Sequence, residues 1–182
     1  MTDIGTSPSD YRLLVPRDWF RIDLMHERWR GQLKTFVDKE IAGSGTPAQV
    51  ARSVWVRLRN TAENGLRRGA LEFYLRTEPT EGSVLPASLL ISWPPVAHGL
   101  APAVEEFAEA LARRAGSETE VDVMDLPAGR TVRVRAAANM DFHVHMPGGA
   151  GYLHLAFSAP LSGTHGPMGE LCEAMAHSVR WV

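Results

Sequence analysis

The stretch that most constrains the fold is the run from Arg130 to Phe157, where polar and apolar residues alternate. The alternation holds over residues 130–136 and 142–146, and it resumes over 152–157 after a turn rich in glycine. Successive side chains of a strand point to opposite faces of its sheet. The pattern therefore predicts neighbouring antiparallel strands that end in a hairpin.

Odd and even positions in this stretch separate two kinds of side chain. The apolar set is expected to share one face of the sheet and contains Val132, Val134, Phe142, Val144, Met146, Leu153, Leu155 and Phe157. The polar set is then expected to share the other face and contains Arg133, Arg135, His143, His145 and His154. A register that pairs Val144 with Leu155 places His145 opposite His154. The sequence thus predicts a basic, histidine-rich face.

Helices are predicted where apolar residues recur every three or four positions. Such spacing indicates a helical pair within residues 24–68, whose second member begins at a capping box with proline at its first position, Thr46-Pro47-Ala48-Gln49. Two later helices are expected after Pro102 and after Pro167. Further strands are expected at 11–15, 71–76, 84–93 and 120–124.

The length and composition indicate one folded domain. The chain has 182 residues, of which 45% are hydrophobic and 22% charged, a mix typical of globular proteins. Residues 1–9 are too small and polar to order themselves, so we expect them to be disordered. Residues 10–182 are expected to form a single α+β domain, a mostly antiparallel sheet packed by helices on one or both faces.

Charge and hydropathy exclude several classes of function. The net charge of −2 argues against a dedicated nucleic-acid binder, which carries a basic surplus. The first ten residues do not form a secretory signal, and no apolar run reaches the ~20 residues of a membrane-spanning helix. The single cysteine, Cys172, lies on the apolar stripe of the last helix and is expected to be an inert buried thiol. We therefore expect a cytoplasmic protein that does not insert into membranes.

His143, His145 and His154 are the candidate metal ligands. Two imidazoles two residues apart on a strand and a third across from them could bind zinc, with water as the fourth ligand. Arg133 and Arg135 on the same face oppose a dication, and the hairpin carries no further acid; Asp141 lies just outside it. The alternatives are a solvated or helix-covered polar face and a site for an anion or an acidic partner, which suits arginine. We expect no cofactor and no catalytic residues.

Two further expectations concern individual side chains. Clustered histidines and arginines repel once the imidazoles are protonated, so we expect the pKa values of these histidines to be lowered. Trp55 lies one step off the inward stripe of its helix. It either marks an exposed contact surface or belongs to a wide apolar stripe.

Several segments carry a resemblance to a known family. Residues 14–22, 85–93, 126–134 and 180–182 resemble a family of uncharacterised actinobacterial proteins, some of which are associated with type VII secretion loci. The order of elements also resembles the PsbP-like α/β/α sandwich, a fold that serves mainly as a protein-binding adaptor. The resemblance spans most of the chain and names no catalytic residue. The helical pair at 24–68 departs from that fold.

The sequence favours a non-enzymatic protein-binding or adaptor module. Its partner is expected to be another protein, with a component of a bacterial type VII secretion system as the candidate that the resemblance implies; a homodimer is left open. The expected binding residues are Arg133, Arg135, His143, His145, His154 and Trp55. The alternative is a small metal-dependent or anion-binding enzyme that uses the three-histidine strand face.

Overall fold

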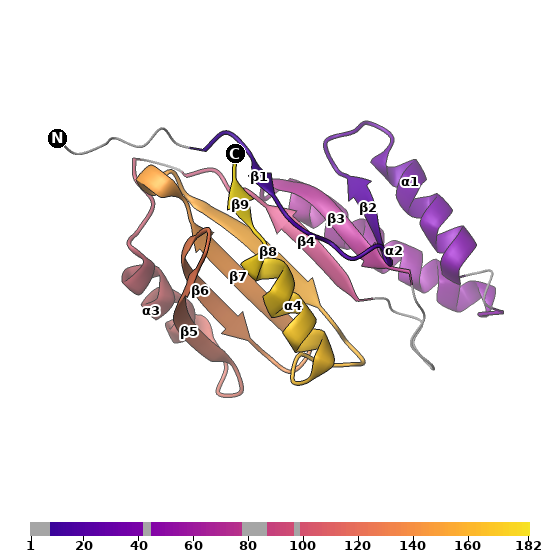
Figure 1. Ribbon diagram of the computed structural model, residues 1–182. Helices are drawn as coiled ribbons and strands as arrows, with labels where there is room; N and C mark the ends of the chain where they lie inside the picture. Colours follow the sequence, from indigo (N-terminus) through magenta and orange to yellow (C-terminus); the bar gives the residue numbers. More distant parts are fainter. Residues whose placement is uncertain (1–7, 42–44, 78–86, 97–98) are drawn as a thin grey trace.

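The computed structural model describes residues 8–41, 45–77, 87–96 and 99–182 (Figure 1). The expected disorder of residues 1–7, the turn at 78–82 and the start of the predicted strand at 84 lie outside these ranges. Ser9 and Asp10 donate backbone hydrogen bonds to the carbonyl of Val182, so the two ends of the described chain lie side by side.

A seven-stranded antiparallel sheet forms the centre of the molecule. In spatial order its strands are β2 (Trp19–Asp23), β3 (Ala70–Arg76), β4 (Ser88–Ser92), β8 (Tyr152–Ser158), β7 (Asn139–His145), β6 (Gly129–Arg135) and β5 (Glu120–Leu126). A separate two-stranded sheet pairs β1 (Tyr11–Arg12) with β9 (Arg180–Trp181). The predicted α+β class and its antiparallel sheet are confirmed.

Four α-helices flank the sheet within the described ranges. They are α1 (Trp29–Phe36), which continues into a π-helical turn η1 (Val37–Ile41), α2 (Ala48–Leu66), α3 (Val104–Arg114) and α4 (Pro167–His177). A short 3₁₀ turn, η3 (Pro147–Gly149), joins β7 to β8. All four helices fall where the three- and four-residue spacing predicts them, although α1 begins at Trp29 rather than near residue 24.

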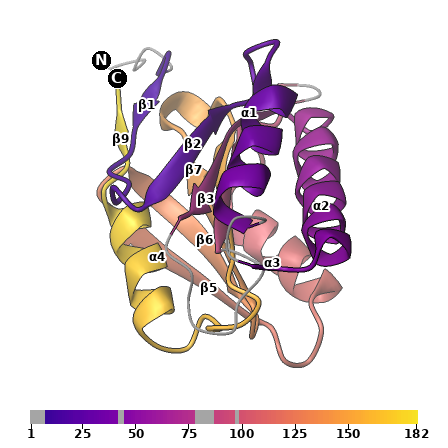
Figure 2. The ribbon, with the colours of Figure 1, turned by 90° about the vertical axis from the view of Figure 1, so that its right-hand side faces the viewer.

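Helices cover both faces of the sheet. Figure 2 shows α4 on one side, which we call the α4 face, and α1, α2 and α3 on the other, which we call the three-helix face. On the α4 face, Cys172 and Met175 pack with Phe142 and Leu155. Because each sheet face meets an amphipathic helix, both faces bury apolar side chains.

Two separate clusters fill the three-helix face. α2 packs over β3 and β4, where Val54 and Leu58 join the cluster of Phe73. Gly65 of α2 lies so close to β4 that an added Cβ would be 2.8 Å from Leu90. α3 packs over β5 and β6, where Val104 and Ala108 meet Val132, and its cluster also includes Tyr152 at the start of β8. Strands β8 and β7 therefore lie between the two helices.

The predicted division of the faces is wrong for β6. Val132 pairs with His143 and Arg133 pairs with Phe142, so Val132 shares the three-helix face with His143 while Arg133 and Arg135 lie on the α4 face. The hairpin between β6 and β7 closes when Ala136 donates to the carbonyl of Asn139, leaving two residues in the turn. This turn pairs even-numbered residues of β6 with odd-numbered residues of β7, so that each such pair shares a face. Val132 is therefore on the face of His143, where it is fully buried under α3.

The predicted register between β7 and β8 is also displaced. Val144 pairs with Leu153 rather than Leu155, and His143, not His145, pairs with His154. A displacement of two residues leaves every side chain on its predicted face, because the side-chain period of a strand is two. The apolar set on β7 and β8 is therefore buried as expected, and only the pairing of the histidines changes.

Candidate functional site

The predicted basic, histidine-rich face does not exist as one surface, because its arginines and histidines lie on opposite faces. Arg133 donates hydrogen bonds to Glu173 of α4 at 2.6 Å and to Asp122 of β5 at 2.7 Å. Arg135 donates to the same Glu173 at 3.3 Å and lies 3.8 Å from Glu120. Both guanidinium groups are mostly covered. They attach α4 to the sheet and present no free cationic surface.

Two of the three histidines form a stacked pair on the three-helix face. The rings of His143 and His154 lie 4.3 Å apart between centroids and only 11° from parallel. The carboxylate of Asp141 accepts a hydrogen bond from Nε2 of His154 at 2.7 Å. His145 is not part of this stack; its ring lies 5.0 Å from that of its cross-strand neighbour Tyr152.

Helix α3 covers one member of this pair, His143. Phe107 meets the ring of His143 edge-on at 5.1 Å and lies 4.5 Å from the ring of Tyr152, whose hydroxyl donates to the carbonyl of Pro102. Burial, and then the charge of neighbouring His154, lower the pKa of His143 to about 3. His143 is therefore neutral at ordinary pH. Its pKa is lowered as expected, but burial is the main cause and the arginines have no part in it.

The geometry does not bring the three histidines to one point. Within the described ranges, no group of three or more histidine, cysteine or acidic side chains is arranged to hold a metal ion. Zinc requires each ligating nitrogen about 2.1 Å from a common centre. An imidazole nitrogen directs its lone pair in the plane of the ring, so two nearly parallel rings 4.3 Å apart do not direct their lone pairs at one centre.

Trp55 is half-buried and packs against the cluster between α1, α2 and the sheet. The guanidinium of Arg59 lies 5.9 Å from its ring centroid. This placement matches the wide apolar stripe, the second of the two alternatives for this residue. Trp55 thus contributes to the packing of α2, and its role in binding stays a prediction.

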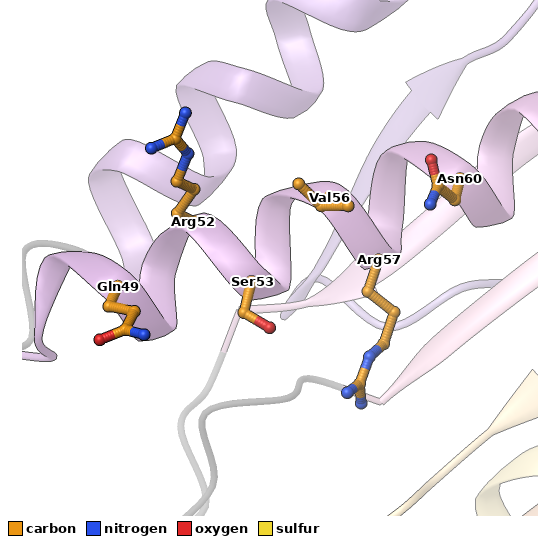
Figure 3. Close-up of a pocket in the computed structure, with 6 residues that line it drawn as sticks. All are labelled: Gln49, Arg52, Ser53, Val56, Arg57 and Asn60. Atoms are coloured by element: carbon orange, nitrogen blue, oxygen red, sulfur yellow. The ribbon is translucent and has the colours of Figure 1, made fainter.

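The structure shows a surface that the sequence interpretation missed, on the outer side of α2. Six side chains of this one helix line a shallow hollow of about 520 Å³, and we call them the outer α2 stripe (Figure 3): Gln49, Arg52, Ser53, Val56, Arg57 and Asn60. Arg52 and Arg57 are exposed and form no ion pair with any other residue of the described ranges. Val56 between them is 38% exposed.

A signal for this stripe is present in the sequence. Residues 52–68 contain five arginines and a single acid, Glu63. Arg59 lies 4.0 Å from Glu63, and Arg30 of α1 donates to the same carboxylate. One acid thus serves two arginines, which leaves the outer side of α2 with a surplus of positive charge.

No helix of the described part is both long and apolar enough to cross a membrane. Comparison of the chain with protein-family models, with curated proteins and with solved structures found no match.

Proposed function

We propose that this chain is a non-enzymatic protein-binding or adaptor module that binds an acidic protein surface through the outer α2 stripe. The observation that carries the proposal is the pair of exposed arginines, Arg52 and Arg57, on either side of exposed Val56 along one hollowed helix face. A rigid helix presents these groups without the entropy cost of ordering a loop.

The residue types of the stripe suit a protein partner. Arginine is enriched at protein interfaces, and its planar fork binds carboxylates with two hydrogen bonds. An exposed valine between two arginines adds apolar surface that is removed from water on binding. The hollow is shallow and lies on one helix, which suits a protein surface better than an enclosed small molecule.

The charge around the stripe favours an acidic partner. Residues 27–68, which include α1 and α2, contain nine lysines and arginines against four acids, a net charge of +5. A local field of this sign speeds encounter with acidic surfaces and raises the selectivity for them. The resemblance to proteins associated with type VII secretion loci is the reason to look for the partner first among secretion components.

The alternative, an enzyme that uses His143, His145 and His154, has less support. The contact that favours an enzyme most is the hydrogen bond between Asp141 and His154, which resembles an acid–base pair. His143, however, is neutral and covered by Phe107, and His145 lies outside the stack. These contacts are those of side chains that support α3 on the sheet.

A capture experiment with matched charge reversals tests the proposal. The wild type, Arg52→Glu/Arg57→Glu and the control Arg12→Glu/Arg17→Glu would each be used to capture proteins from the native host. The control makes the same change of charge at two other exposed arginines, one on β1 and one that follows it. We expect one acidic protein to be captured by the wild type and the control, and to be lost with the α2 variant and at high salt.

The captured protein is then purified and its affinity measured by calorimetry. We expect the α2 variant to bind at least tenfold more weakly than the control, a difference of about 1.4 kcal/mol. Equal binding by the two variants would show that the outer α2 stripe is not the contact surface.

A further inference from the structure

We propose that the outer α2 stripe binds helix α3 of a second copy of this chain, so that two copies form a two-fold symmetric dimer through their three-helix faces. This inference rests on the proposed function of α2 as a protein-binding surface and adds a second copy of the chain to the acidic surfaces that the stripe binds.

The first two turns of α3 provide the complementary charge. Glu105, Glu106 and Glu109 are all exposed there. Glu106 forms no ion pair with the described residues, and Glu109 has only a loose contact of 3.8 Å with Arg113. Glu105 pairs with Arg130 at 2.8 Å. Glu106 and Glu109 are thus available to the arginines of another molecule.

The opposite charges are segregated over longer segments as well. Residues 104–126, which include α3 and β5, contain seven acids and two arginines, a net charge of −5. This equals in size the +5 of residues 27–68, although the whole chain carries only −2. A small net charge does not oppose self-association, whereas local charges of opposite sign favour it.

The placement of the two helices allows both contacts to form at once. α2 lies over β3 and β4, α3 lies over β5 and β6, and strands β8 and β7 lie between them. In the proposed dimer the two-fold axis runs above β8 and β7, between the facing sheets of the two copies. A rotation of 180° about this axis exchanges the positions of α2 and α3. Each α2 then meets the α3 of the other copy, as a self-complementary two-fold interface requires.

Exposed apolar side chains on the same face add to the charge argument. Val50 and Val56 of α2 are 36% and 38% exposed, and Val123 of β5 is 38% exposed. Val123 pairs with Val132 and so belongs to the three-helix face. Leu100, which precedes α3, is 77% exposed. Burial of these side chains between two copies removes apolar surface from water.

The basic residues of α3 limit the contact to one end of the helix. Arg113 and Arg114 lie in the last turn, where cations interact favourably with the helix dipole. The three glutamates lie in the first two turns, so the outer α2 stripe is expected to lie against that end. This arrangement keeps Arg113 away from Arg52 and Arg57 of the other copy.

Charge exchange between two variants tests the dimer. Sedimentation velocity is measured over a range of concentrations for the wild type, for Arg52→Glu/Arg57→Glu and for Glu106→Lys/Glu109→Lys. We expect the wild type to dimerise, less at high salt, and each variant alone to remain monomeric, because its α2 and α3 then carry the same sign. An equimolar mixture of the two variants is expected to form a heterodimer, since both contacts again pair opposite charges.

The outcomes are decisive in both directions. The control Arg12→Glu/Arg17→Glu is expected to dimerise like the wild type. A monomeric wild type at every concentration, a variant that still dimerises alone, or a mixture that stays monomeric would overturn the inference. Circular dichroism checks that each variant is folded.

The α3 variant separates this inference from the proposed function. Glu106→Lys/Glu109→Lys leaves the outer α2 stripe intact, so it is expected to lose the dimer and still capture an acidic host protein. If the wild type is monomeric but still captures a host protein through Arg52 and Arg57, the dimer is wrong and the proposed function is unaffected.

Discussion

The imidazole rings of His143 and His154 stack across β7 and β8 at 4.3 Å, and the two histidines have different surroundings. His154 is hydrogen-bonded to Asp141, whereas His143 lies under Phe107 of α3. This burial favours the neutral form of His143. The pair therefore links the packing of α3 to the protonation of one histidine.

Stability is predicted to fall in mild acid because of His143. Its pKa is about 3 in the folded protein and about 6.5 in the unfolded chain, so the unfolded state binds the proton more readily. The contribution to stability is complete above pH 6.5 and is lost as the pH falls toward 3. Its limiting slope is about 1.4 kcal/mol per pH unit, since one proton is taken up.

Urea unfolding over this pH range measures the effect. His143→Phe removes the titrating group but keeps a ring beneath Phe107, so its free energy of unfolding is expected to depend less on pH than that of the wild type. His165→Gln, at an exposed position, serves as the control and should follow the wild type. Parallel curves for all three proteins would show that His143 titrates normally.

Removal of the Glu173 carboxylate is predicted to destabilise the contact of α4 with the sheet. Glu173 accepts from both Arg133 and Arg135, and the Nε atoms of both arginines are already buried without a hydrogen-bond partner in the described part. Glu173→Gln is expected to cost about 1–3 kcal/mol in denaturant unfolding. Glu170→Gln, an exposed position on the same helix, should cost almost nothing. Equal losses would contradict the structural role of Glu173.

A methyl group at Gly169 is predicted to force α4 away from the preceding loop. A Cβ added there would clash with the carbonyl oxygen of Thr164, whereas one added at Gly31 of α1 meets nothing within 4 Å. Gly169→Ala is therefore expected to lower the melting temperature. Gly31→Ala is expected to raise stability by about 0.5–1 kcal/mol, because alanine favours helix over glycine. A neutral Gly169→Ala would show that α4 does not approach Thr164 this closely.

The sequence is sufficient to predict the elements but not how their faces are shared. The spacing that predicts α2 and the alternation along β7 and β8 are local properties, and both agree with the structure. The face of Val132 depends on a turn of two residues at 137–138 and on a helix, α3, that comes earlier in the chain. Because both faces of this sheet are covered, apolar residues on β6 do not reveal which face they occupy.

The pairing of the charged side chains is not evident from the sequence for a related reason. The sequence places Arg133 and Arg135 among the expected binding residues, but each has acidic partners from elements distant in sequence, α4 in particular. Arg52 and Arg57 belong to no sequence motif. Only the structure shows that they lie on either side of Val56 and form no ion pair within its described ranges. Sequence patterns locate charges along the chain, whereas their pairing depends on tertiary structure.

The most direct test of α2 as a binding surface is the reactivity of a thiol placed within it. Ser53→Cys lies on the outer α2 stripe, and the native Cys172 is buried with its pKa raised to about 12 by that burial, so only the new thiol should react with a maleimide. His165→Cys supplies an exposed thiol outside the stripe. The labelling rate is compared between buffer and native host extract at low protein concentration. We expect labelling of Ser53→Cys to slow several-fold in the extract and to recover at high salt, while labelling of His165→Cys is unchanged. Equal rates for Ser53→Cys in buffer and in extract would contradict it.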